Sequence, residues 1–206
     1  TVLCGEITMN LADYNTLQKI LKSKGFNTKK SLGQNFLVNP DVCPAMAKSA
    51  CDKDTGALEI GPGAGVLTRE LAANAKRVVA IELDERLAPV LEYTLSDKDN
   101  VEVIFGDAMK IDLTALIKEK FADCKRVAVC ANLPYYITSP IIMMLLESKL
   151  PIDNITVMVQ KEAAERLTAK PLAAVPMSMT FPMGLPSAVP WKVWTIIYTV
   201  LMNLLK

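Results

Sequence analysis

Histidine is absent from this 206-residue sequence, and cysteine occurs only five times. The cysteine count is odd and no C-x-x-C pair occurs, which disfavours a zinc site built from cysteine and histidine. The missing histidine also argues against a mechanism that uses imidazole as base or nucleophile. We therefore expect no metal, and buried reduced thiols in a cytoplasmic protein are the simplest interpretation. The N-terminus shows no charged start followed by an apolar run, so no signal peptide is expected.

Acidic residues are missing from one stretch near the N-terminus, although the whole chain has a balanced net charge of +1. No Asp or Glu lies between Tyr14 and Pro40. The same stretch contains five lysines: Lys19, Lys22, Lys24, Lys29 and Lys30. Such a local basic surface can attract phosphate groups. From charge alone, a solvated helix face is the simpler interpretation.

The last 35 residues, Leu172 to Lys206, also lack acids, and five prolines fall between Pro171 and Pro190. The apolar run that follows, residues 193–205, is shorter than the roughly 18 residues of a membrane span. It could form an edge strand, a buried helix or a non-native end. The abrupt loss of acids suggests a truncated or frame-shifted coding sequence.

Between residues 57 and 167, short apolar runs alternate with longer helical patterns. The predicted strands are 57–61, 77–83, 101–107, 126–131 and 154–160. The predicted helices are 13–24, 40–51, 65–74, 85–95, 113–120, 139–148 and 161–167, with Pro140 in the first turn of the helix 139–148. Strands separated by helices predict an α/β fold, a parallel sheet with helices on both faces. Ligands of such sheets bind beyond the carboxyl ends of the strands.

A glycine-rich turn, E-I-G-P-G-A-G, joins the first predicted strand to the next helix. Gly61, Gly63 and Gly65 form G-x-G-x-G, whereas a dinucleotide fold needs its third glycine where this chain has Val66. The spacing therefore favours a nucleoside with a small charged group over a pyrophosphate, although a tight turn alone would also use these glycines.

Two carboxylates end the second and third predicted strands. Glu82 follows the glycine turn by about 20 residues, where an acid binds ribose hydroxyls. The nearby Asp84 is expected to cap a helix. Asp107 could accept a hydrogen bond from an adenine amine, but considered by itself it is more simply interpreted as a turn residue. Taken together, three strand ends with Gly, Glu and Asp form a cleft suited to S-adenosylmethionine, and the chain resembles class I methyltransferases.

The fourth predicted strand ends in N-L-P-Y, residues 132–135. The side-chain oxygen of Asn132 and the carbonyl of Pro134 could accept hydrogen bonds from both N–H groups of an adenine N6 amine and aim its lone pair at a methyl carbon. Tyr135 could stack on the base. No strong base is needed, so catalysis would come from positioning and charge stabilisation. A rigid loop with an aromatic plug is the simpler alternative.

The complete set of motifs resembles the ribosomal RNA adenine N6,N6-dimethyltransferases, and within them the housekeeping small-subunit branch. The set consists of K-S-L-G-Q-N-F-L (30–37), E-I-G-P-G-A-G (59–65), I-E-L-D (81–84), G-D-A-M (106–109), N-L-P-Y-Y-I-T-S-P (132–140) and V-M-V-Q-K-E (157–162). The resemblance runs from about residue 13 to Pro171. It implies a Rossmann-like methyltransferase domain over 40–171, an N-terminal helix and basic loop over 1–39, and an atypical tail over 172–206 without the family's helical C-terminal domain.

The resemblance also implies an activity and its residues. The expected reaction is S-adenosylmethionine-dependent dimethylation of two adjacent adenosines in a hairpin near the 3′ end of small-subunit (16S) rRNA, during ribosome biogenesis. The expected catalytic residues are Asn132, Pro134 and Tyr135. The expected cofactor contacts are Asn35, Leu37, Gly61, Gly63, Glu82, Asp107 and Asn132. The expected RNA contacts are Lys22, Lys24, Lys29 and Lys30.

The expected partner is the immature small (30S) subunit, bound by a cytoplasmic monomer that has no membrane association. Two alternatives stay open: an erythromycin-resistance-type methyltransferase that acts on 23S rRNA, and an inactive RNA-binding or assembly factor with the same fold. A dehydrogenase is disfavoured by Val66.

Overall fold

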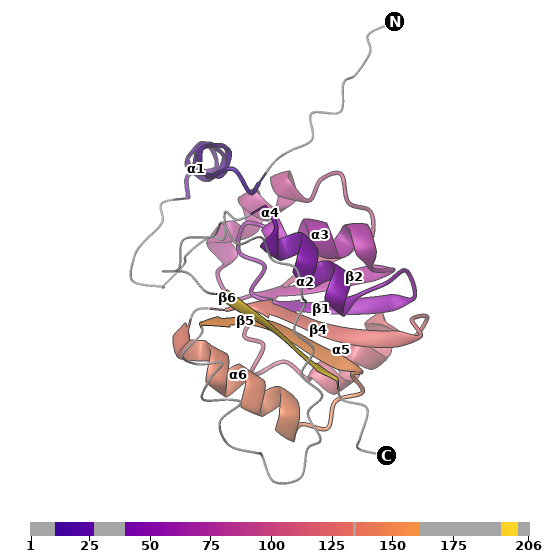
Figure 1. Cartoon of the computed structure of the whole chain (residues 1–206). Helices are drawn as coiled ribbons and strands as arrows, with labels where there is room; N and C mark the ends of the chain where they lie inside the picture. The colour runs from indigo at the N-terminus through magenta and orange to yellow at the C-terminus, as the bar shows by residue number, and fades with distance from the viewer. Residues whose placement is uncertain (1–10, 27–39, 134, 161–194, 202–206) are drawn as a thin grey trace, which may run out of the picture.

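The computed structural model of the chain describes residues 11–26, 40–133, 135–160 and 195–201. One six-stranded sheet has the order β3-β2-β1-β4-β5-β6 (Figure 1). Its strands are β1 (Thr55–Ile60), β2 (Arg77–Glu82), β3 (Val101–Phe105), β4 (Arg126–Asn132), β5 (Asn154–Gln160) and β6 (Thr195–Leu201). The first five are parallel, as predicted, and β6 runs antiparallel to β5.

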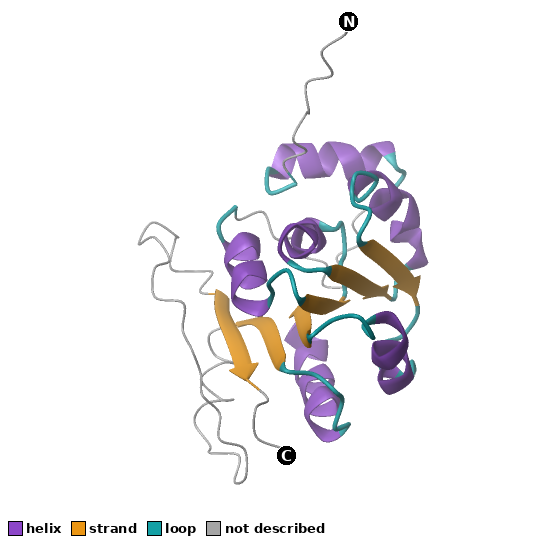
Figure 2. Ribbon diagram, turned by 90° about the vertical axis from the view of Figure 1, so that its right-hand side faces the viewer, coloured by secondary structure: helices purple, strands orange, loops and turns teal. Residues whose placement is uncertain are grey.

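Helices cover both faces of this sheet, which confirms the predicted α/β architecture (Figure 2). They are α1 (Tyr14–Ser23), α2 (Val42–Ala50), α3 (Val66–Asn74), the short 3-10 helix η2 (Glu85–Leu87), α4 (Ala88–Thr94), α5 (Leu113–Lys120) and α6 (Tyr135–Glu147). Helices α5 and α6 lie on one face, and α2 and α3 on the other. No helix in the described ranges is long and apolar enough to cross a membrane.

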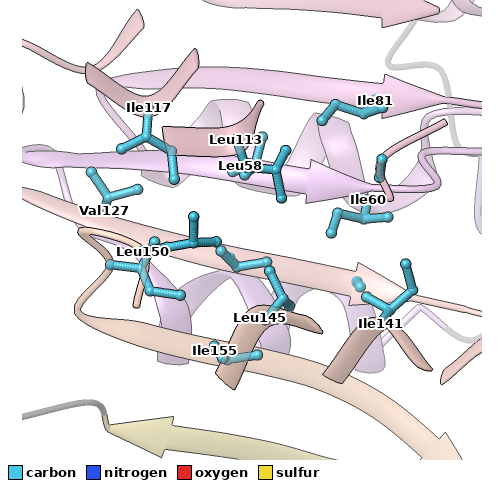
Figure 3. Packing of buried hydrophobic residues seen from close by; sticks show 14 of the residues in the cluster. Leu58, Ile60, Ile81, Leu113, Ile117, Val127, Ile141, Leu145, Leu150 and Ile155 are labelled. Carbon is cyan, nitrogen blue, oxygen red and sulfur yellow. The ribbon is translucent and has the colours of Figure 1, made fainter. Parts of the chain in front are cut away.

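The larger core lies between the sheet and helices α5 and α6. Leu58 of β1 and Val129 of β4 are fully buried there, and Ile117 and Leu145 reach them from the two helices (Figure 3). Strand β1 is buried along its whole length. Both of its faces are therefore covered, which explains why parallel strands read as nearly continuous apolar runs in the sequence.

Helix α1 is attached to the rest of the molecule through α4. The side chain of Asp13 caps α1 by accepting a hydrogen bond from the Thr16 N–H at 2.7 Å. The buried face of α1 packs with residues of η2 and α4 in one apolar cluster: Leu17, Ile20, Leu21, Leu87, Val90 and Leu91. This contact attaches α1, together with its exposed lysines, to the sheet domain.

Helix α6 begins at Tyr135, four residues before the predicted start, and Pro140 lies in its interior. The prediction placed Pro140 in the first turn because proline is favoured there. That interpretation was wrong, because β4 runs to Asn132 and the chain enters the helix almost at once. Pro140 has no N–H to donate to the carbonyl four residues earlier, so α6 has one backbone hydrogen bond fewer.

The sequence left three possibilities open for the apolar run near the C-terminus. In the structure, part of this run forms a strand at the edge of the sheet. Residues Thr195–Leu201 form β6, and seven residue pairs join it to β5. The predicted helix 161–167 lies outside the described residues.

Candidate functional site

Three of the predicted site residues lie at one level on three adjacent strands. Ile60 of β1 is paired with Ile81 of β2 and with Ala131 of β4. The next residue on each strand is Gly61, Glu82 and Asn132, respectively. The strand order therefore brings these residues together at the carboxyl edge of the sheet, where α/β proteins bind ligands.

The glycine turn has the backbone conformation that its sequence predicts. Gly61, Gly63 and Gly65 have φ values of 74°, 59° and 85°, a region that L side chains rarely adopt. A Cβ at Gly65 would lie 3.0 Å from the hydroxyl of Thr94, and a Cβ at Gly61 would lie 3.2 Å from Leu133. The turn thus packs closely against α4 and against the residue after Asn132.

Glu82 links the glycine turn to the end of β2. Its carboxylate accepts a hydrogen bond from the Gly63 N–H at 3.0 Å and another from the Asp84 N–H at 2.9 Å. The side chain is buried, and burial raises its pKa while the two backbone donors oppose that rise. Each carboxylate oxygen still has a lone pair for a further donor. Asp84 caps η2 by accepting from the Arg86 N–H, as predicted.

Asp107 follows β3 and serves as a turn residue in this structure. One of its carboxylate oxygens accepts from the Met109 N–H at 3.0 Å, and the other lies 3.4 Å from the exposed ammonium of Lys110. Its backbone carbonyl also accepts from Lys110 and Ile111. Asp107 therefore makes the contacts of a turn residue, and its predicted contact with an adenine amine stays a prediction.

Asn132 is the last residue of β4 and is only partly buried. Its neighbour Leu133 approaches Gly61, so the N-L-P-Y segment borders the glycine turn. The backbone of Tyr135 begins α6. The position of the Tyr135 ring is not described, and Pro134, Lys29, Lys30, Asn35 and Leu37 lie outside the described residues.

Lys22 and Lys24 are exposed at the end of α1, the helix that packs against η2 and α4. The Lys24 ammonium lies 4.5 Å from the centre of the Tyr93 ring on α4. The Arg86 guanidinium, four residues beyond Glu82, lies 5.6 Å from the Phe26 ring. Of the two rings, Phe26 is buried and Tyr93 is exposed, so Lys24 and Tyr93 form an exposed pair of a cation and an aromatic ring on α1 and α4.

Sequence reasoning missed two residues at this edge. Leu83 directly follows Glu82 and is 65% exposed, so an apolar side chain faces outward beside the cleft. Glu59, two residues before Gly61 on β1, is 1% exposed. Burial raises the Glu59 pKa to about 8, the nearby Thr68 hydroxyl opposes the rise, and Glu82 adds to it. An acid within the apolar run A-L-E-I-G was the available signal for Glu59.

Within the described part of the chain, no group of three or more His, Cys, Asp or Glu side chains could hold a metal ion. The site consists instead of backbone N–H groups, carboxylates, one amide and an exposed apolar side chain.

The sequence model of the family described as ribosomal RNA adenine dimethylase matches residues 25–175. The chain belongs to this family. Two curated relatives carry the name ribosomal RNA small subunit methyltransferase A. The one from Bacillus pumilus (strain SAFR-032) is 53% identical over 155 residues, which are 75% of this chain and 53% of the relative. The one from Geobacillus thermodenitrificans (strain NG80-2) is 52% identical over 163 residues, which are 79% of this chain and 56% of the relative.

This chain of the rRNA adenine dimethylase family spans about half the length of the curated relatives that it matches. Among solved structures it is similar to the 23S rRNA methyltransferase ErmE, with a TM-score of 0.61, 30% identity, and coverage of 81% of this chain and 69% of that one. A dimethyladenosine transferase from Plasmodium falciparum has a TM-score of 0.58 at 28% identity, with coverage of 79% and 62%. An RNA methyltransferase from Salinibacter ruber, crystallised with S-adenosyl-L-homocysteine, shares the fold at 16% identity, with a TM-score of 0.55 and coverage of 82% and 94%.

Proposed function

We propose that the chain catalyses S-adenosylmethionine-dependent dimethylation of the N6 amines of two adjacent adenosines in a hairpin near the 3′ end of small-subunit rRNA. The observation that carries this proposal is the row of Gly61, Glu82 and Asn132 at the carboxyl edge of the sheet, in a chain of the rRNA adenine dimethylase family. The small-subunit assignment rests on relatives of that name that are about half identical to this chain.

The residues of the cleft fit S-adenosylmethionine, which when bound supplies a methyl group on a positively charged sulfur. Gly61 and Gly63 have positive φ values and no side chain, so a ligand could approach the backbone of the turn closely there. Glu82 would accept hydrogen bonds from the ribose hydroxyls through its remaining lone pairs. Leu83 would lie against one face of the adenine, and Asp107 would accept from its amine. We further propose that Asn35 and Leu37 close over this ligand.

Asn132 would act on the substrate amine from the same edge. Its side-chain oxygen would accept one N–H of the target adenine, and the carbonyl of Pro134 the other, which directs the nitrogen lone pair toward the methyl carbon. Tyr135 would hold the base flat by stacking, an interaction of about 1–3 kcal/mol per base. The product amine loses its proton readily, so the absence of histidine does not hinder the reaction.

The RNA around the target would contact the surface formed by α1 and α4. Lys22 and Lys24 supply positive charge there, and Lys29 and Lys30 would extend it. The Tyr93 ring is 44% exposed under the Lys24 ammonium and offers a stacking face next to a cation. We propose that the protein works there as a cytoplasmic monomer on immature small subunits.

The second candidate is methylation of 23S rRNA, which the similarity to ErmE favours. The experiment that separates the two candidates is methyl transfer from labelled S-adenosylmethionine to immature small subunits, with large subunits as the matched control. Label in the small-subunit rRNA alone supports the proposal, and label in the large-subunit rRNA alone supports the alternative. Retention of RNA without any transfer would instead indicate a binding or assembly factor.

A further inference from the structure

Glu59 is an acid buried directly under the candidate site. It lies in the middle of the sheet, paired with Ala80 of β2 on one side and with Cys130 of β4 on the other. Side chains alternate between the faces of a strand, so residues two positions further on share its face. Glu82 lies two positions after Ala80, and Asn132 lies two positions after Cys130. The side chain of Glu59 therefore shares a face of the sheet with Glu82 and Asn132, two residues before the carboxyl ends of the strands.

No cationic side chain in the described surroundings compensates a negative charge on Glu59. None of the ion pairs in the described ranges includes it. Its Oε2 atom is buried without a hydrogen-bond partner. The hydroxyl of Thr68 on α3 is near enough to oppose the rise in the Glu59 pKa, but it does not meet the geometry of a hydrogen bond. An ionised carboxylate in such a place is costly, and the usual outcome is that the group keeps its proton.

The other titratable groups near Glu59 also favour the neutral acid. They are Glu82 from β2, Cys43 from α2 and Cys130 from β4, with Cys51 next to Cys130 and Glu70 of α3 near Cys43. All of these groups are acids or thiols, and none can supply a positive charge.

We propose that Glu59 carries a proton while the cleft is empty and releases it to the solvent when the cationic cofactor occupies the cleft. The proposal rests on the proposed function, because it takes the ligand to be S-adenosylmethionine. A positive charge beside the row of Gly61, Glu82 and Asn132 would supply the compensation that the empty protein lacks. The carboxylic O–H bond breaks, its proton goes to the buffer, and the cofactor itself is unchanged. The charge of Glu59 thus follows occupancy of the site.

The test is calorimetry of S-adenosylmethionine binding at pH 6.5 in two buffers that differ in ionisation enthalpy. At this pH the α-amino group of the ligand is already protonated. We expect the wild-type protein to release about one proton per bound cofactor, and the release to fall toward zero above about pH 9. S-adenosylhomocysteine, which lacks the sulfonium charge, should release clearly fewer protons.

The variant Glu59→Gln should bind the cofactor without releasing a proton, whereas the control Glu70→Gln should behave as wild type. Infrared difference spectra of the wild-type protein give a second readout: the band of a protonated carboxylic acid should disappear when the cofactor binds. If Glu59→Gln does not fold, the same band measured in Glu82→Gln separates the two acids, because a band from Glu59 should persist in that variant and still disappear on binding.

An enthalpy of wild-type binding that is the same in both buffers would overturn the proposal, and so would unchanged proton release by Glu59→Gln, which would point to Glu82 instead. Either result, obtained with methyl transfer intact, would leave the proposed function standing. Proton release from Glu59 without methyl transfer to any rRNA would refute the proposed reaction alone.

Discussion

Replacing Glu59 by glutamine should remove a large part of the pH dependence of folding. Burial raises the pKa of Glu59 from 4.5 to about 8 in the folded chain, whereas the unfolded chain keeps a value near 4.5. The two values differ by roughly 3.5, and each unit corresponds to about 1.4 kcal/mol. Through Glu59 alone, the free energy of unfolding is therefore expected to be about 4–5 kcal/mol larger at low pH than at high pH.

The direction follows from where the protons are bound. Below pH 4.5 both states hold the proton, and the contribution is fully present. Between pH 4.5 and about 8 the unfolded chain ionises and the folded chain does not, so the free energy of unfolding falls as pH rises. Above about pH 8 both states are ionised and the curve flattens.

Urea unfolding at several values between pH 5 and 9 measures this dependence. The difference between wild-type protein and Glu59→Gln reports Glu59 together with its interaction with Glu82, whose own burial acts in both proteins. The Arg69 guanidinium lowers the pKa of Asp97, so that group loses its contribution only at strongly acidic pH, outside this window. Parallel curves for the two proteins between pH 5 and 8 would refute the reasoning.

Three further predictions concern single side chains. Glu82→Ala should weaken cofactor affinity by roughly 1.5–3 kcal/mol through the loss of charge-assisted hydrogen bonds, as measured by calorimetry, whereas the control Glu102→Ala, which removes a partly buried acid of β3 that pairs with Lys120, should bind normally. Unchanged affinity would remove Glu82 from the ribose contact. Asn132→Ala should abolish methyl transfer while the circular dichroism spectrum and thermal midpoint stay near wild type, and substantial turnover would exclude the amine contact. Gly56→Ala should destabilise the fold by about 1–3 kcal/mol, because the added Cβ would lie 2.3 Å from the Phe121 ring; a thermal midpoint equal to that of wild type would contradict this.

The sequence was a good guide to those parts of the fold that depend on neighbouring residues. Strands β1 to β5 were predicted within about two residues, because both of their faces are covered and their residues form short apolar runs. The positive φ values of the glycine turn and the cap at Asp84 are equally local, and both were predicted correctly. Gly61, Glu82 and Asn132 could be expected at one edge because parallel strands end together.

The errors and omissions concern features that depend on distant parts of the chain. Ser139 and Pro140 have the local pattern of a helix start, but α6 begins at Tyr135, immediately after β4. The protonation of Glu59 depends on its burial beneath α2 and α3, and no short stretch of sequence reveals that burial. The antiparallel pairing of β6 with β5 joins segments on either side of residues 161–194, so composition alone could not choose between strand and helix.

That pairing has a consequence for how the chain reaches its folded state. The edge of β5 stays uncovered until Thr195–Leu201 arrives, and the long intervening segment makes this step slower than closing a hairpin. During that interval a β6 segment from another molecule can add to the same edge, since antiparallel ladder bonds are identical whether the strand comes from the same chain or from a neighbour. Refolding yield should therefore depend on protein concentration, and exchange of β6 between two copies is the form that misassembly would take.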